Sequence, residues 1–165
     1  MTRRLALVAL LALAGCGGGE PWVEYQSASP PSGIEPAGTR TNQGRGNDPD
    51  AGKEAFKLRP REGESIGYAV AVRNVTDQDI SVTGVVADED RDGAFVPGSV
   101  ADAPVKIPRG QRGQVTVEGT IHGCQYGGQQ VPLAGPELEM RDADGEERTQ
   151  ELALDVRVDI VVEGC

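Results

Sequence analysis

The chain has 165 residues, of which 26 are acidic and 16 are basic, so its formal net charge is −10 at pH 7. A surface this acidic repels nucleic acid and anionic lipid head groups, so no nucleic-acid partner is expected. The sequence contains one histidine and two methionines, which excludes the His-rich and Met-rich metal carriers. Aromatic residues make up 4% of the chain, fewer than a domain that stacks sugars or bases usually has.

The N-terminus has the layout of an export signal. Thr2-Arg3-Arg4 is a short basic region, and Leu5 to Ala14 is an apolar run of about ten residues, too short to span a membrane. Leu13-Ala14-Gly15-Cys16 then closely resembles the lipobox of bacterial lipoproteins. The resemblance implies that signal peptidase II removes residues 1–15 and that Cys16 is lipidated, which would anchor the protein by its lipid on the extracytoplasmic face of the cell membrane. An ordinary secretory signal with a chance cysteine is the alternative.

Residues 16–52 are predicted to form a lipidated, disordered stalk. The segment is rich in Gly, Pro, Ser, Asn and Thr, as in Ser29-Pro30-Pro31-Ser32-Gly33, and cannot bury enough apolar surface to offset its chain entropy. Trp22-Val23-Glu24-Tyr25 is an exception. This apolar island either docks on the domain, sits at the lipid interface or is a solvated part of the linker.

From about Lys53 onward, apolar and polar residues alternate, which predicts β-strands. Strands are expected within residues 56–58, 66–72, 80–86, 105–107, 115–121, 138–140 and 152–162. Polar turns are expected at 74–79, 108–113 and 142–145, and Gly84 is expected to mark a bulge. The last strand is expected to be long, because apolar residues occupy every even position from Leu152 to Val162.

About seven short strands, with no helical periodicity after the signal, favour one all-β domain over residues 53–165, an antiparallel sandwich. A Gly-rich turn, a strand ending at Arg73-Asn74, a Val-rich strand and a late cysteine loosely resemble the immunoglobulin-like domains of exported bacterial lipoproteins. The resemblance implies an immunoglobulin-like β-sandwich. The chain departs from antibody domains, because Trp22 lies in the predicted stalk and Cys124 and Cys165 are too close in sequence, so no adhesion role follows.

Two cysteines, Cys124 and Cys165, remain after Cys16. Outside the cytoplasm an even pair is most simply a disulfide, here between two strand ends. Metal-ligating thiolates are the alternative, but no CxxC spacing supports them. His122 could form a nucleophilic pair with Cys124 only if that thiol is free. No hydrolase, zinc-peptidase or phosphate-loop motif occurs, so no catalytic residues and no enzymatic activity are expected.

Asp88-Glu89-Asp90-Arg91-Asp92-Gly93 matches the opening of a calcium-binding loop. The match then fails, because the twelfth position is Ser99 instead of a bidentate Glu, and Pro97 intrudes. A solvated acidic loop is therefore favoured, and no cofactor or strong metal site is expected. The weak calcium candidates are Asp88, Asp90 and Asp92.

These observations together predict a membrane-anchored bacterial lipoprotein. Its expected function is non-catalytic binding or structural support of an envelope protein partner. Two alternatives remain open. One is a calcium-stabilised module that binds a surface or wall glycan, and the other is an accessory subunit of a membrane enzyme complex.

Overall fold

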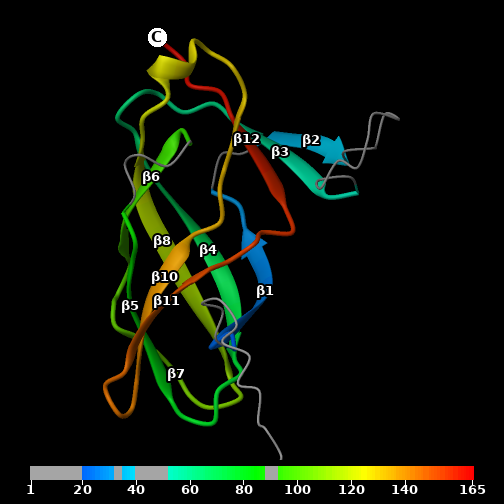
Figure 1. The fold of residues 1–165 in the computed structure, drawn as a ribbon. Coiled ribbons are helices and arrows are strands. Elements are labelled where there is room, and N and C mark those ends of the chain that lie inside the picture. The colour runs from blue at the N-terminus through cyan, green and yellow to red at the C-terminus, as the bar shows by residue number, and fades with distance from the viewer. Residues whose placement is uncertain (1–19, 32–34, 40–51, 88–92) are drawn as a thin grey trace, which may run out of the picture.

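The computed structural model describes residues 20–31, 35–39, 52–87 and 93–165 (Figure 1). Within these ranges the chain forms twelve β-strands and one short 3₁₀ helix, η1 (Cys124–Tyr126). No helix in the described ranges is long and apolar enough to cross a lipid bilayer. The expected all-β class is confirmed, with more strands than the sequence pattern predicts.

Two four-stranded sheets face each other and form the sandwich (Figure 1). The first sheet has the order β1 (Val23–Ser29), β4 (Ser65–Asn74), β8 (Arg112–Ile121) and β6 (Phe95–Val100). The second has the order β11 (Glu147–Glu151), β10 (Glu137–Asp142), β5 (Ile80–Val85) and β7 (Val105–Ile107). Every neighbouring pair in these two sheets is antiparallel, as expected.

A third, smaller sheet lies beside the sandwich (Figure 1). Its order is β2 (Glu35–Thr39), β3 (Glu54–Leu58), β12 (Arg157–Ile160) and β9 (Val131–Pro132). The β3–β12 pair is parallel and joins Ala55 to Arg157 and Leu58 to Ile160. The prediction of a purely antiparallel domain is therefore wrong at this point. Alternation of apolar residues identifies strands but gives no direction for partners about a hundred residues apart.

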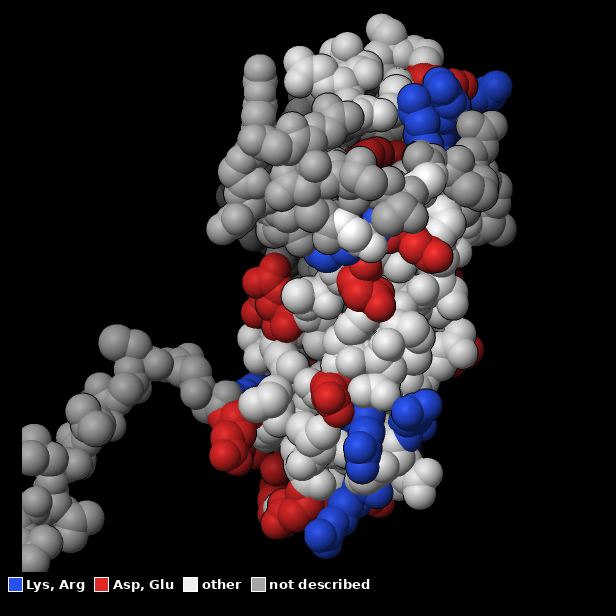
Figure 2. Space-filling model, turned by 90° about the vertical axis from the view of Figure 1, so that its right-hand side faces the viewer, with Lys and Arg blue, Asp and Glu red and all other residues white. Residues whose placement is uncertain are grey.

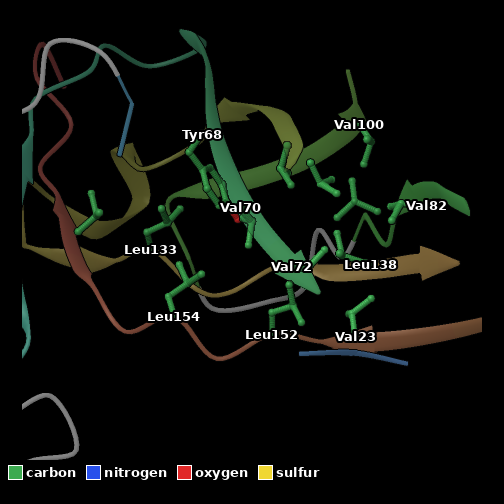
Figure 3. Close-up of a cluster of buried hydrophobic side chains, with 14 of the residues drawn as sticks. Val23, Tyr68, Val70, Val72, Val82, Val100, Leu133, Leu138, Leu152 and Leu154 are labelled. Carbon is green, nitrogen blue, oxygen red and sulfur yellow. The ribbon is translucent and has the colours of Figure 1, made fainter. Parts of the chain in front are cut away.

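The core consists of aliphatic side chains that alternate along the facing strands. In β4 and β8, every second residue is buried, which places Val70, Val72, Val115 and Val117 between the two sheets. Val82 and Leu138 come from the opposite sheet, and Figure 3 shows Leu138 and Val82 near Val72 and Val100. The period of two read from the sequence thus gives the buried face correctly.

The expected start of the domain at residue 53 is too late. Residues 23–29 form β1, which pairs with β4 from Val23 opposite Asn74 to Ser29 opposite Ala69. The side chains of Trp22 and Val23 are 9% and 1% exposed, so the apolar island docks on the domain. Residues 35–39 form β2, which pairs with β3. The disordered-stalk prediction is wrong for these segments, because the polar residues of β1 form backbone hydrogen bonds to β4 that composition does not reveal.

The expected long final strand is divided in two. β11 pairs with β10, whereas β12 pairs with β3 and β9, and residues 152–156 connect them. The alternating burial nevertheless persists through the connection, since Leu152, Leu154, Val158, Ile160 and Val162 are all buried. The chain therefore keeps the same face toward the core while its hydrogen-bonded partner changes from β10 to β3 and β9.

The predicted turns are confirmed. At the β10–β11 hairpin the Asp142 carboxylate accepts hydrogen bonds from the backbone N–H groups of Asp144 (3.0 Å) and Glu146 (2.8 Å), and Gly145 has φ = 88°. The acidic residues there are explained by turn geometry. The predicted bulge also occurs, because the β5–β10 register shifts between the Val82–Met140 and Gly84–Glu139 pairs.

Asn74 fixes the turn after β4 from inside the domain. Its side chain is fully buried, and its Nδ2 donates to the carbonyls of Gln78 (2.8 Å) and Ile107 (2.9 Å). Its Oδ1 accepts from the backbone N–H of Thr76 at 2.9 Å. Both the oxygen and the nitrogen of the amide therefore have hydrogen-bond partners within the domain, which gives Asn74 a structural role.

Candidate functional site

Cys124 and Cys165 form the predicted disulfide, with their Cα atoms 5.3 Å apart. Cys124 begins η1, directly after β8, and Cys165 follows β12. The bond therefore joins the first sheet of the sandwich to the third sheet. We call this part of the molecule the disulfide end and define it by Glu62, His122, Cys124 and Cys165.

Glu62 is the acidic member of the disulfide end. Its Oε2 accepts hydrogen bonds from the backbone N–H groups of Gly123 (2.8 Å) and Cys124 (3.0 Å). Its Oε1 lies 3.3 Å from Nδ1 of His122. The hydrogen bonds from the two amides, Gly123 first, hold the pKa of the Glu62 carboxyl below its ordinary value. The carboxylate is exposed to solvent yet fixed in direction.

The same geometry decides how His122 and Cys124 can act. With its sulfur bonded to Cys165, Cys124 has no thiolate with which to attack a substrate. His122 faces the Glu62 carboxylate. A Cys–His nucleophilic pair is therefore not formed in the oxidised chain.

The outer face of the first sheet has a shallow groove of about 430 Å³. It runs over β4, β8 and β6, where Gly67, Gly98 and other small residues leave the backbone of the sheet uncovered by side chains. Glu118 supplies the charge in this groove, and its Oε2 accepts a 3.4 Å hydrogen bond from the Ser99 hydroxyl. Such a surface can admit a side chain or a segment of another protein close to the strands.

The opposite end of the sandwich holds the start of the described chain. Trp22 lies in a hollow lined by residues of the 74–79 turn and of the β10–β11 hairpin. The Arg148 guanidinium lies 5.9 Å from the centre of the Trp22 ring, and its Nη1 donates to the Glu20 carbonyl at 2.6 Å. We call this region the Trp22 end.

Several predicted site residues lie outside the described residues. Cys16, with the whole lipobox, is one of them, and the calcium candidates Asp88, Asp90 and Asp92 are the others. Gly93 is the first described residue after these candidates, and its N–H donates to the Tyr126 hydroxyl at 3.1 Å.

Sequence reasoning missed Glu62, because one carboxylate in a short turn carries no local pattern. It also missed Gln150, which lies just before the expected final strand and belongs to the edge strand β11 in the structure. The only sequence signal for such a role is a polar residue with a long side chain on an edge strand. Residues of this kind are too common on edge strands to identify one that bonds to another strand.

Comparisons with known proteins provide no family for the chain. No protein-family model matches it, and no curated protein matches it. Among solved structures, the Vibrio cholerae VesB protease is similar with a TM-score of 0.35 and 17% sequence identity over 66% of this chain. This chain spans only 30% of that protease chain. A likeness at this level carries no argument about activity.

Proposed function

We propose that the protein is a lipid-anchored extracytoplasmic β-sandwich that binds or supports a protein of the cell envelope without catalysing a reaction. The observation that carries the anchoring is Leu13-Ala14-Gly15-Cys16, which follows a basic and an apolar segment of signal-peptide length. The Cys124–Cys165 disulfide supports an oxidising compartment, where such bonds persist.

Because Trp22 is buried in the domain, the segment between the lipid anchor and the domain is much shorter than the predicted stalk of residues 16–52. Five residues lie between Cys16 and Trp22, and the six steps from one Cα to the next span about 20 Å in a fully extended chain. A lipid on Cys16 would therefore hold the Trp22 end close to the bilayer, and the disulfide end would project away from it. A domain held this near the membrane is suited to contact the exposed part of a neighbouring membrane protein.

The groove of about 430 Å³ over β4, β8 and β6 is the proposed contact surface. Its small residues allow close approach, and Glu118 favours a partner that presents a basic side chain. On the face in Figure 2, acidic side chains are spread along the domain and the described Lys and Arg residues gather toward its two ends.

Anchoring is tested with Cys16→Ser. We expect the variant to leave the membrane fraction, and mass spectrometry of the wild-type N-terminus to find a lipid on Cys16. The double variant Cys124→Ser/Cys165→Ser is the matched control, because it removes the other two cysteines and should remain with the membrane. An unmodified wild-type N-terminus that begins elsewhere would contradict the anchoring proposal.

Partner binding is tested with a photo-crosslinking amino acid at Ser99, on the groove. The control places it at Thr149, an exposed residue on the outer face of the second sheet. We expect a discrete protein adduct in membranes from position 99 only. Equal labelling from both positions, or no adduct from position 99, would refute the groove as the contact surface.

A further inference from the structure

We propose that the disulfide end is a latent zinc site that forms when the Cys124–Cys165 bond is reduced. The ligands are Glu62 and the two cysteines. One ligand atom from each of these residues already lies within 4.8 Å of the other two. The three residues come from distant parts of the chain, so their convergence is a property of the fold. The inference goes beyond the proposed function and does not depend on it.

The donor set suits zinc better than calcium or magnesium. Zinc is a borderline-soft ion that binds both soft thiolates and a carboxylate oxygen, whereas calcium and magnesium require oxygen ligands alone. Around a tetrahedral zinc with Zn–S of about 2.3 Å and Zn–O of about 2.1 Å, the ligand atoms lie roughly 3.6–3.8 Å apart. The observed 4.8 Å limit is within reach of that arrangement by side-chain rotation. Water would occupy the fourth position.

Glu62 is held in the direction that such a site requires. The amides of Gly123 and Cys124 fix one carboxylate oxygen, and His122 lies against the other at 3.3 Å. Hydrogen bonds of this kind orient metal-ligating carboxylates. His122 is therefore a positioning residue for Glu62, and the cysteines are the groups that change between the two redox states.

The chemistry balances as a two-electron exchange. A dithiol reductant transfers two electrons, so the Cys124–Cys165 bond breaks, two thiols form and the reductant becomes a disulfide. Zinc then replaces the two thiol protons, which are released to solvent. In the oxidised chain the sulfurs have no negative charge and are poor ligands. Cys165 and Glu62 are exposed and Cys124 is half-buried, so both reductant and zinc can reach the site.

The test uses the full chain, oxidised and reduced, with zinc as the probe. Equilibrium dialysis should find one zinc per reduced chain and none on the oxidised chain. Zinc should also slow the reaction of the Cys124 and Cys165 thiols with a thiol reagent at least tenfold. If reduction loosens this end, zinc should restore the far-UV circular dichroism of the oxidised chain. Equal zinc binding in both redox states, or no thiol protection, would overturn the proposal.

Variants then separate ligation from a general effect on folding. Glu62→Gln should weaken zinc binding by the reduced chain at least about 10–100-fold, the range seen when a residue that only supports a metal ligand is lost. Glu64→Gln is the matched control, because Glu64 lies in the same turn but its carboxylate accepts from the Arg61 N–H (2.8 Å). Reduced Glu64→Gln should bind cobalt(II) with a thiolate charge-transfer absorption, which reports that the cysteine sulfurs ligate the metal. Equal zinc affinity of the two variants would show that Glu62 is not a ligand and would overturn the proposal.

Discussion

The side-chain amide of Gln150 takes the place of a strand partner for the backbone at Trp22. Its Oε1 accepts from the Trp22 N–H at 2.9 Å, and also from the Val23 N–H at 3.2 Å. Its Nε2 donates to the Val23 carbonyl at 2.8 Å. Through this one residue, the edge strand β11 of the second sheet is joined to the beginning of the edge strand β1 of the first.

Replacing Gln150 by alanine should lower the free energy of unfolding by about 2 kcal/mol. The reason is that two N–H groups and one carbonyl in a partly buried position lose their partner. Urea denaturation measures the loss, and hydrogen exchange should locate it at β1. Gln114→Ala is the control, because Gln114 is exposed on β8. The prediction fails if both variants unfold at the same urea concentration.

Tyr25 predicts a loss of stability at high pH. Burial, followed by the hydrogen bond that Tyr25 donates to Asp155, raises its pKa to about 12. An unfolded tyrosine titrates near pH 10, so between about pH 10 and 12 the unfolded chain binds fewer protons than the folded one. The stability contributed by the protonated phenol is complete below about pH 10 and is lost as the pH rises through about 12.

The measurement compares wild type with Tyr25→Phe. Ultraviolet absorbance should show one tyrosine of the folded wild type ionising near pH 12, and that step should be missing in the variant. The pH-dependent fall of stability above pH 10 should be smaller in the variant. A Tyr25 ionisation near pH 10 in the folded chain would contradict the prediction.

Gly119→Ala should destabilise the sandwich by about 1–3 kcal/mol, because there is no room for a methyl group. A Cβ at Gly119 would lie 2.7 Å from Cε2 of Phe95, whose ring stands edge-on to Tyr68 with the centroids 5.5 Å apart. Gly67→Ala is the control on the neighbouring strand, since its Cβ would have ordinary contacts, the nearest at 3.5 Å. Thermal unfolding of the two variants should therefore differ clearly, and equal melting temperatures would refute the argument.

Asn74→Ala should lower the free energy of unfolding by about 3 kcal/mol, since it leaves the partly buried carbonyl of Gln78 and the buried carbonyl of Ile107 without their donor. The adjacent Val75, which is 45% exposed, provides the control. Val75→Ala should change stability by less than about 0.5 kcal/mol. Denaturant titrations compare the two, and a loss at Asn74 no larger than at Val75 would show that the turn does not need the amide.

Reduction of Cys124–Cys165 in the absence of zinc should lower stability by about 4 kcal/mol, from the chain entropy of a 41-residue separation. The sandwich should remain folded, because Val70, Val115 and the other core residues do not depend on the bond. Cys124→Ala/Cys165→Ala should match the reduced wild type. Circular dichroism and denaturant titration decide the matter, and complete unfolding on reduction would be the contrary result.

Alternation of apolar residues was sufficient to predict β4 and β8 and the buried face of residues 152–162. These features depend only on which side of a strand is apolar. The Asp142–Gly145 hairpin was also predictable, because its turn chemistry is local. The pairing of Cys124 with Cys165 was predictable because these two cysteines remain after Cys16 in a chain that is expected to be exported.

The elements that the sequence did not reveal depend on contacts between distant residues. β1 contains Glu24, Gln26 and Ser27, which are typical of a linker, and it is ordered through its pairing with β4 and through Gln150. The division at residues 152–156 is hidden because side-chain periodicity reports burial and not the identity of the paired strand. Glu62 becomes a site residue only when the fold brings the amide of Cys124 to it.

The parallel pairing of β3 with β12 has a consequence for the order in which the domain can fold as the chain is synthesised from its N-terminus. β1 and β4 can pair as soon as residue 74 has emerged, and β10 and β11 are joined by a short turn. β3 must wait for residues 157–160, about a hundred positions later, before that edge is covered. Until then β3 presents unpaired N–H and C=O groups along that edge, which favours aggregation. The third sheet is therefore the last of the three to be completed, and a truncated chain that ends before residue 157 should aggregate through this open edge.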